Sequence, residues 1–373
     1  MKFTLAFDSY KDALRSAEVG RAVAEGIRAV LPAAEIVEIP LSDGGEGFVE
    51  AVAAASPGAR LRDFAATDAL GRPVTARTAF LADAAVVECA SCCGIEQLTP
   101  AERDPRRTDT FGLGTLLRSV AASSPRRIVI GLGGSATVDG GLGMLRALGV
   151  RFYDEAGQLI ETGGGEALMR VRRCDVSGAI ALPLLTAACD VTNPLCGETG
   201  AAPVFGPQKG ASPELVRALD AALARYGALL ADAFGRPLSA PGDGAAGGLG
   251  FALRMLGADT VSGADLLFAW SDFDRRVPGS ALLITGEGRS DAQTAAGKLP
   301  MAAARRAARL GVPAALVSGA LADDAAALCD DFSVVMSIAS GPGPLEAALA
   351  QTAANLRRAG ANIAALVKTG GAR

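Results

Sequence analysis

Three short segments place carboxylates beside glycines or a cation, which are the residue types that could bind Mg²⁺ and a charged substrate. They cover residues 8–11, 43–47 and 286–291, and each follows a strand-like run. The carboxyl ends of parallel strands meet at one edge of a sheet, where ligands bind. A single Asp at a strand end is more often a helix N-cap than a catalyst. Three such loops together favour a site for Mg²⁺ and a charged substrate.

The clearest single motif is a glycine-rich loop at residues 131–143, which follows a strand-like run and leads into a small-residue helix start. Backbone N–H groups of such a loop can close on an anion, and the helix N-terminus adds a favourable partial charge, so the motif predicts a phosphate-binding loop. Gly131, Gly133 and Ala136 also fit the G-x-G-x-x-A pattern of a dinucleotide site. No Gly-Lys-Ser/Thr closes the loop, so it is not a Walker A motif. A tight turn that packs a helix on a strand is the alternative.

Two further loops carry single polar residues that suit catalysis. Asp190 follows a strand-like run and could be a general base or a metal ligand, or it could form an Asx turn with Asn193 and Pro194. Lys209 lies among glycines, and we interpret it as a cation free to reach phosphate or carboxylate. Both loops therefore join the predicted site.

The composition excludes several classes of function. Histidine is absent, which leaves acid–base chemistry to carboxylates, Lys, Tyr or Cys. The 36 basic and 40 acidic residues give a net charge of −4 without a basic run, so we expect small-molecule partners rather than nucleic acid or a membrane. No apolar run reaches the roughly 18 residues that span a bilayer, and we expect a cytoplasmic protein. Cys89 and Cys92 could begin a zinc site, but packed thiols are the favoured interpretation.

The elements that must position these residues alternate between strands and helices. At the N-terminal end, a strand at residues 2–7, a helix over residues 17–30 and a strand at residues 35–39 follow one another. The C-terminal end has the same order, beginning with the strand-like residues 281–285. Successive strand–helix units favour a parallel sheet, so we predict one doubly wound α/β sheet built from both chain ends.

The length of 373 residues suits two domains. We place the first at residues 1–58 and 278–373, and the second, an inserted α/β domain, at residues 59–277. Within the insertion, residues 77–81 and 85–89 resemble paired strands.

Taken together, the motifs resemble those of bacterial glycerate kinases of the two-domain type that form 2-phosphoglycerate. The resemblance runs almost end to end, and its motifs are highly specific as a set. They are residues 8–11, 43–47, 70–74, 131–141, 189–200, 205–211, 242–250 and 285–291. The resemblance implies a flavodoxin-like domain made from both chain ends, with a large inserted α/β domain that resembles restriction-endonuclease topology.

The chain departs from the usual family pattern at several positions. Tyr10 and Asp12 stand where the family has Phe and Gly, and residues 89–94 replace a Met-Ala-x-Ala-Ser-Gly run. Val138 stands where Asn is frequent. These departures bear on substrate preference more than on the class of reaction.

The function that the resemblance implies is ATP-dependent phosphorylation of D-glycerate on its C2 hydroxyl, with Mg²⁺ bridging the phosphates. Phosphoryl transfer needs positioning and charge stabilisation more than covalent chemistry, and these loops supply both. We expect Asp190 to orient or deprotonate the hydroxyl, and Lys11 and Lys209 to neutralise the transferred charge.

The remaining assigned residues fall into three sets. Those expected to bind ATP are Gly133, Gly134, Ser135 and Asp139. Those expected to bind the substrate are Asp8, Ser9, Arg72, Asn193 and Arg289. Those expected to bind the metal are Asp43, Glu46 and Asp291.

Two other functions stay open at this point, and a homodimer is possible. An NAD(P)-dependent dehydrogenase of a small hydroxy acid would use the glycine fingerprint for a dinucleotide. A non-catalytic sugar-acid sensor would bind glycerate without turnover. Neither function explains the acidic loops at both ends of the chain.

Overall fold

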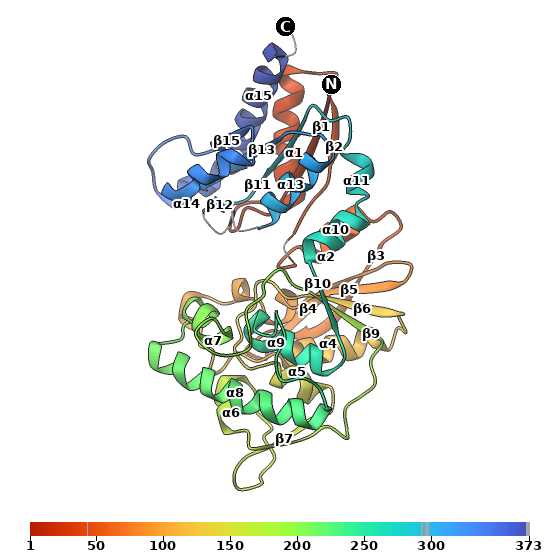
Figure 1. Ribbon diagram of the computed structural model, residues 1–373, viewed down its shortest axis with the longest axis vertical. Helices are drawn as coiled ribbons and strands as arrows, with labels where there is room; N and C mark the ends of the chain where they lie inside the picture. Colours follow the sequence, from red (N-terminus) through yellow and green to blue (C-terminus); the bar gives the residue numbers. More distant parts are fainter. Residues whose placement is uncertain (43, 292–293, 295–297, 371–373) are drawn as a thin grey trace. The chain divides into compact units, whose positions relative to one another are not determined.

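The computed structural model describes residues 1–42, 44–291, 294 and 298–370, apart from the side chains of residues 324–327. The chain forms two compact units. The first unit contains Met1–Asp43, Glu50–Pro57 and Ala264–Arg373, and the second contains Gly44–Val49 and Gly58–Gly263. The domain ranges expected from the sequence stay a prediction. Figure 1 shows the course of the chain.

The first unit contains a five-stranded parallel sheet that joins the two ends of the chain. Its strand order is β15-β13-β11-β1-β2. Phe3 of β1 pairs with Leu282 of β11, and the central strands are almost fully buried because helices cover the sheet. The strands are β1 (Lys2–Phe7), β2 (Glu35–Glu38), β11 (Leu282–Gly286), β13 (Ala314–Ser318) and β15 (Val334–Ser337).

Two long helices of the first unit, α1 (Ser16–Val30) and α15 (Thr352–Gly370), lie side by side (Figure 1). Val19, Val23 and Ile27 recur at helical spacing and form the buried face of α1. A Cβ on Gly26 would lie 1.9 Å from the carbonyl oxygen of Arg357, so glycine lets the two backbones touch. The other elements of this unit are α10 (Gly263–Trp270), α11 (Phe273–Arg276), β12 (Arg289–Ser290), α13 (Leu299–Arg309), β14 (Ala320–Leu321), η4 (Asp323–Asp330) and α14 (Leu345–Ala350), and α2 (Phe48–Ala55) begins in the second unit and ends in the first.

The second unit contains a six-stranded mixed sheet of order β10-β9-β6-β5-β4-β3. The first four strands of this order are parallel, whereas β4 runs antiparallel to both of its neighbours. The strands are β3 (Arg60–Thr67), β4 (Pro73–Phe80), β5 (Ala84–Glu88), β6 (Arg127–Gly131), β9 (Leu184–Ala188) and β10 (Asp259–Val261). A separate hairpin pairs β7 (Arg151–Tyr153) with β8 (Arg173–Asp175).

Most helices of the second unit share one large apolar core with its sheet. The helices of this unit are α3 (Ala90–Cys93), η1 (Ile95–Gln97), η2 (Pro100–Glu102), α4 (Phe111–Ala121), α5 (Leu142–Ala147), α6 (Gly164–Arg170), α7 (Ala201–Phe205), η3 (Pro207–Lys209), α8 (Pro213–Phe234) and α9 (Ala245–Met255). The mixed α/β class with parallel sheets is thus confirmed, and the expected strand pair near residues 77–89 is the antiparallel β4–β5 pair. No helix among the described residues is long and apolar enough to cross a bilayer.

Candidate active site

Three loops of the second unit leave its sheet at the same edge. Glu88, Gly131 and Ala188 end three adjacent parallel strands and lie in register. The glycine-rich loop follows Gly131, and Asp190 follows Ala188 by two residues with an exposed side chain. The sheet therefore brings the predicted base and the predicted phosphate loop to one edge, where ligands of parallel sheets bind.

The glycine-rich loop packs directly against the backbone of residues 44–47. Gly133 donates its N–H to the carbonyl oxygen of Gly44 at 3.0 Å. A Cβ on Gly133 would lie 2.5 Å from the Cα of Gly45, and a Cβ on Gly131 would lie 2.4 Å from the Gly44 oxygen. Only glycine fits at these two positions, and the Gly133 N–H is already bonded within the protein. Contact of Gly133, Gly134 and Ser135 with ATP stays a prediction.

Glu88 is a buried carboxylate that sequence reasoning did not assign to the site. Its side chain accepts hydrogen bonds from the backbone N–H of Val49 at 3.1 Å and of Gly47 at 3.5 Å. It therefore holds the segment that carries Glu46, whose own side chain is exposed. The available signal in the sequence was its place at the end of a strand-like run. Gly47 and Val49 come next to it only in the folded chain.

Lys209 lies buried beneath the glycine-rich loop, with 2% of its surface exposed. Its Nζ donates to the Ser135 hydroxyl at 2.9 Å and to the Thr137 carbonyl oxygen at 2.7 Å. Burial lowers the pKa of Lys209 to about 8, although the neighbouring Cys89, Cys93 and Asp139 act to raise it. The sequence suggested that Lys209 is a cation free to reach a ligand, whereas the structure places it in the interior of the protein. The ammonium group is directed at the loop and stabilises it from within.

Asp139 is fully buried in the loop just before α5 and also organises this loop. It accepts hydrogen bonds from the N–H groups of Thr110, Gly141 and Gly143 and from the Thr110 hydroxyl, at 2.7 to 3.2 Å. Burial raises the pKa of this carboxyl, and the hydrogen bonds oppose the rise. With its oxygens occupied by the protein, the predicted contact of Asp139 with ATP stays a prediction.

Arg72 and Asn193 both contact protein groups in the second unit. The Arg72 guanidinium pairs with Asp68 at 2.5 Å and with Glu102 at 2.7 Å. The Asn193 amide donates to the Thr199 carbonyl oxygen at 2.8 Å. Their predicted contacts with the substrate stay predictions.

The first unit gathers a second set of predicted residues at the carboxyl ends of its strands. Asp8 follows β1 and donates its N–H to the Gly286 carbonyl oxygen at 3.1 Å, and the Asp8 carboxylate accepts from the Ser9 N–H at 2.6 Å. Lys11 and Arg289 are exposed. The loops after β1 and β11 therefore lie together, as the sequence indicated.

Glu287 is the second carboxylate that sequence reasoning left unassigned. It accepts from the hydroxyls of Ser290 at 3.0 Å and Thr294 at 2.6 Å, and burial raises its pKa. Lys298 lies 3.9 Å from Glu287 and 3.4 Å from Asp291. The predicted metal ligand Asp291 is therefore paired with a lysine.

The predicted metal ligands are divided between the two units. Glu46 belongs to the second unit, Asp291 belongs to the first, and Asp43 lies outside the described residues. Among the described residues, no group of three His, Cys, Asp or Glu side chains could hold a metal ion. Cys89 and Cys92, which could have begun a zinc site, are both buried free thiols.

Comparison with known proteins shows extensive similarity. Residues 3–368 match the model of the glycerate kinase family. The chain is 39% identical to glycerate 2-kinase of Escherichia coli (strain K12), covering 99% of both chains, and 38% identical to glycerate kinase of Bacillus subtilis (strain 168), covering 99% and 98%. A crystal structure named for glycerate kinase 2 of Salmonella typhimurium LT2 matches all of both chains with a TM-score of 0.82 at 39% identity.

Removing the Glu88 carboxylate should destabilise the protein. We expect Glu88→Ala to lower the free energy of unfolding by about 1–3 kcal/mol, because buried N–H groups lose their acceptor. Glu88→Gln keeps one acceptor oxygen and should lose less. Urea denaturation followed by circular dichroism measures both, with Glu155→Ala in an exposed turn as the control. A Glu88→Ala variant as stable as this control would contradict the role.

The buried Lys209 should make stability depend on alkaline pH. Its pKa is about 8 in the folded protein against an ordinary 10.5, so the unfolded chain binds more protons between these values. The cost of burying the charge is fully present below pH 8 and is relieved as pH rises to 10.5. We expect the free energy of unfolding of the wild type to rise relative to Lys209→Met by up to about 3 kcal/mol over this range.

The matched control for this measurement is Lys368→Met, which changes an exposed lysine of α15. Its difference from the wild type should stay constant over the same pH range. A constant difference for Lys209→Met as well would show that Lys209 does not titrate from a buried position.

Proposed function

This chain belongs to the glycerate kinase family, and we propose that it transfers the γ-phosphoryl group of ATP to the C2 hydroxyl of D-glycerate, giving 2-phosphoglycerate and ADP. The observation that carries this proposal is the 39% identity, over 99% of both chains, to a protein named glycerate 2-kinase. The dehydrogenase alternative gains no support from the relatives reported above, which are kinases by name.

We assign the proton transfer to Asp190. In the proposed step the glycerate C2 oxygen attacks the γ-phosphorus, the bond from that phosphorus to the β–γ bridging oxygen breaks, and the hydroxyl proton passes to the Asp190 carboxylate. Its support is the exposed position of Asp190 just beyond the carboxyl end of β9, whose parallel neighbour β6 leads into the glycine-rich loop. ADP leaves with the bridging oxygen.

The charged substrates need cationic side chains and Mg²⁺, and the chain offers candidates for these side chains and for the carboxylates that would bind the metal. Lys11 and Arg289 are exposed at loops of the first unit and suit the glycerate carboxylate or the transferred charge. Mg²⁺ usually keeps waters and binds through one or two carboxylates together with substrate phosphates, so a cage of three protein ligands is not required. We propose Glu46 and Asp291 as carboxylates that could each bind Mg²⁺ together with waters and substrate phosphates. The bound ion would neutralise phosphate charge.

Contacts within the protein suggest positioning roles for three of the predicted residues. Lys209 holds the glycine-rich loop, while Arg72 and Asn193 stabilise their own turns through Asp68 and Thr199. We propose that these side chains support the substrate-binding loops from behind.

We propose a flavodoxin-like description for the first unit. Its order β2-β1-β11-β13-β15 supports this, because it corresponds to the 2-1-3-4-5 order of that fold once the intervening strands are left out. Residues 59–277 would then be an insertion, for which the restriction-endonuclease-like label rests on the family resemblance. A homodimer, a cytoplasmic location and the lack of nucleic-acid binding also stay predictions from the sequence.

Product analysis tests the proposed reaction. The purified chain incubated with ATP, Mg²⁺ and D-glycerate should form 2-phosphoglycerate, identified by ³¹P NMR, and omitting Mg²⁺ should abolish it. Formation of 3-phosphoglycerate would contradict the assigned position on the substrate. Absence of any phosphorylated product would contradict the kinase assignment.

Asp190→Asn tests the assigned base in the same assay. We expect kcat to fall about 100-fold or more, since general base catalysis typically contributes this much. Asp259→Asn is the matched control, because Asp259 is an exposed acid at the opposite, amino end of the neighbouring strand β10. Equal activities of the two variants would rule out Asp190 as the base.

A further inference from the structure

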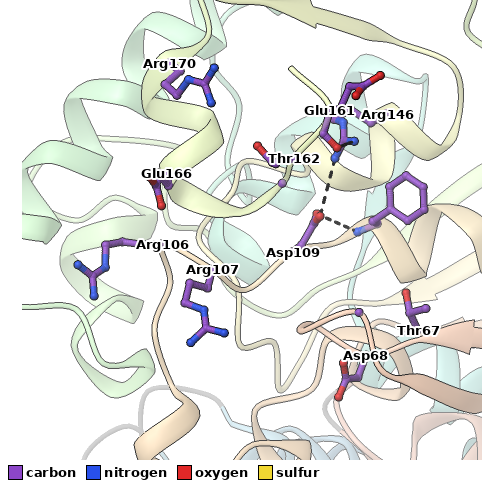
Figure 2. Close-up of a pocket in the computed structure, with 13 residues that line it drawn as sticks. Thr67, Asp68, Arg106, Arg107, Asp109, Arg146, Glu161, Thr162, Glu166 and Arg170 are labelled. Atoms are coloured by element: carbon purple, nitrogen blue, oxygen red, sulfur yellow. Dashed lines mark hydrogen bonds and ion pairs between the residues drawn. The ribbon is translucent and has the colours of Figure 1, made fainter. Parts of the chain in front are cut away.

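The second unit contains a cavity of about 670 Å³ that none of the assigned roles uses. It is lined by the β3–β4 turn, the segment that leads into α4, the end of α5 and the helix α6 (Figure 2). All of these elements belong to the second unit. A volume of this size is typical of sites for small organic ligands.

A partly exposed aromatic ring lines this cavity. Phe111 is the first residue of α4, and 37% of its surface is exposed although a Phe is usually buried. The Arg146 guanidinium carbon lies 5.5 Å from the centre of the ring. Aromatic rings flanked by arginine are surfaces on which nucleobases stack.

Four arginines line the cavity and provide donors for phosphate. The guanidinium of Arg106 is paired with Asp104 at 2.7 Å and that of Arg170 with Asp154 at 3.1 Å, yet both side chains are more than half exposed. Arg107 is exposed; its backbone N–H donates to the Asp104 carbonyl oxygen at 3.0 Å, whereas its guanidinium makes no hydrogen bond or ion pair with the residues that the structure describes. Figure 2 shows Arg106 and Arg107 across the view from Arg146. Arginine forks match the oxygens of phosphate groups.

The cavity also contains carboxylates, which a simple anion would avoid. Asp109 lies 3.9 Å from Arg146, and Cβ atoms on Gly143 or Gly163 would lie within 1.7 Å of its carboxylate, so both glycines make room for it. Burial is the main cause that raises the pKa of Asp109 to about 7, with repulsion from Asp139 second. Glu161 and Glu166 are exposed at the cavity.

We propose that this cavity binds the adenine nucleotide, with the base against Phe111, the phosphates on Arg106 and Arg107, and Glu161 near the sugar hydroxyls. A nucleotide is favoured because it combines a ring, hydroxyls that carboxylates accept from, and phosphates that arginines bind. The proposal rests on the proposed function for the identity of the base. It assigns the nucleotide to a place other than the glycine-rich loop, where the Gly133 N–H is already bonded.

Isothermal titration calorimetry with ADP and Mg²⁺ tests the site without turnover, using the full chain. We expect Arg107→Ala and Phe111→Ala each to raise the Kd of ADP about tenfold, as loss of one stacking or charged contact does. Arg126→Ala and Leu238→Ala are matched controls, because they remove an exposed arginine and an exposed apolar side chain of the same unit outside the cavity. Both controls should keep the wild-type Kd.

The outcomes separate this site from the proposed reaction. A wild-type Kd for ADP in both cavity variants would overturn the site, even if the protein phosphorylates glycerate. Weaker ADP binding in both variants would support the site, even if no phosphoglycerate forms, in which case the proposed function alone would fall. If inorganic phosphate bound as tightly as ADP, and if this binding also required Arg107, the result would contradict a nucleotide ligand.

Discussion

The candidate site depends on the contact between two glycine-rich backbones in the second unit. Gly133 and Gly44 share a hydrogen bond, and neither Gly131 nor Gly133 has room for a Cβ. Because the backbones of the two segments are in direct contact, the loop after β6 is fixed in relation to the segment that carries Glu46. The position of Asp190 follows from the same edge, since its strand pairs in register with β6.

Two buried charges of opposite sign hold the two partners of this contact. The Glu88 carboxylate binds N–H groups of residues 47 and 49, whereas the Lys209 ammonium binds Ser135 and Thr137. Each is costly to bury without hydrogen bonds, so each enforces one loop conformation. A kinase gains from such rigidity, because phosphoryl transfer depends on groups that are positioned before the reaction. Stability and catalysis are therefore coupled through the same loops.

The sequence predicted the parallel strands and the family, because glycine loops after strands and strand–helix alternation are local patterns. It did not predict which polar residues are buried. Lys209 is 74 residues from Ser135 in the chain, and only folding places it beneath the loop. The burial of Glu88 could not be predicted for the same reason, because its hydrogen-bond partners belong to a segment about 40 residues earlier in the chain. The cavity at Phe111 is assembled from four separate elements, so no local motif indicates it.

The activity of Gly133→Ala tests most directly whether the glycine contact positions the reacting groups. The added Cβ would lie 2.5 Å from the Cα of Gly45, so the loops must separate. We predict at least a tenfold fall in kcat for glycerate phosphorylation while circular dichroism stays that of the folded protein. Gly343→Ala is the matched control, since a Cβ there meets no atom within 4 Å. Wild-type kcat in folded Gly133→Ala would contradict the account.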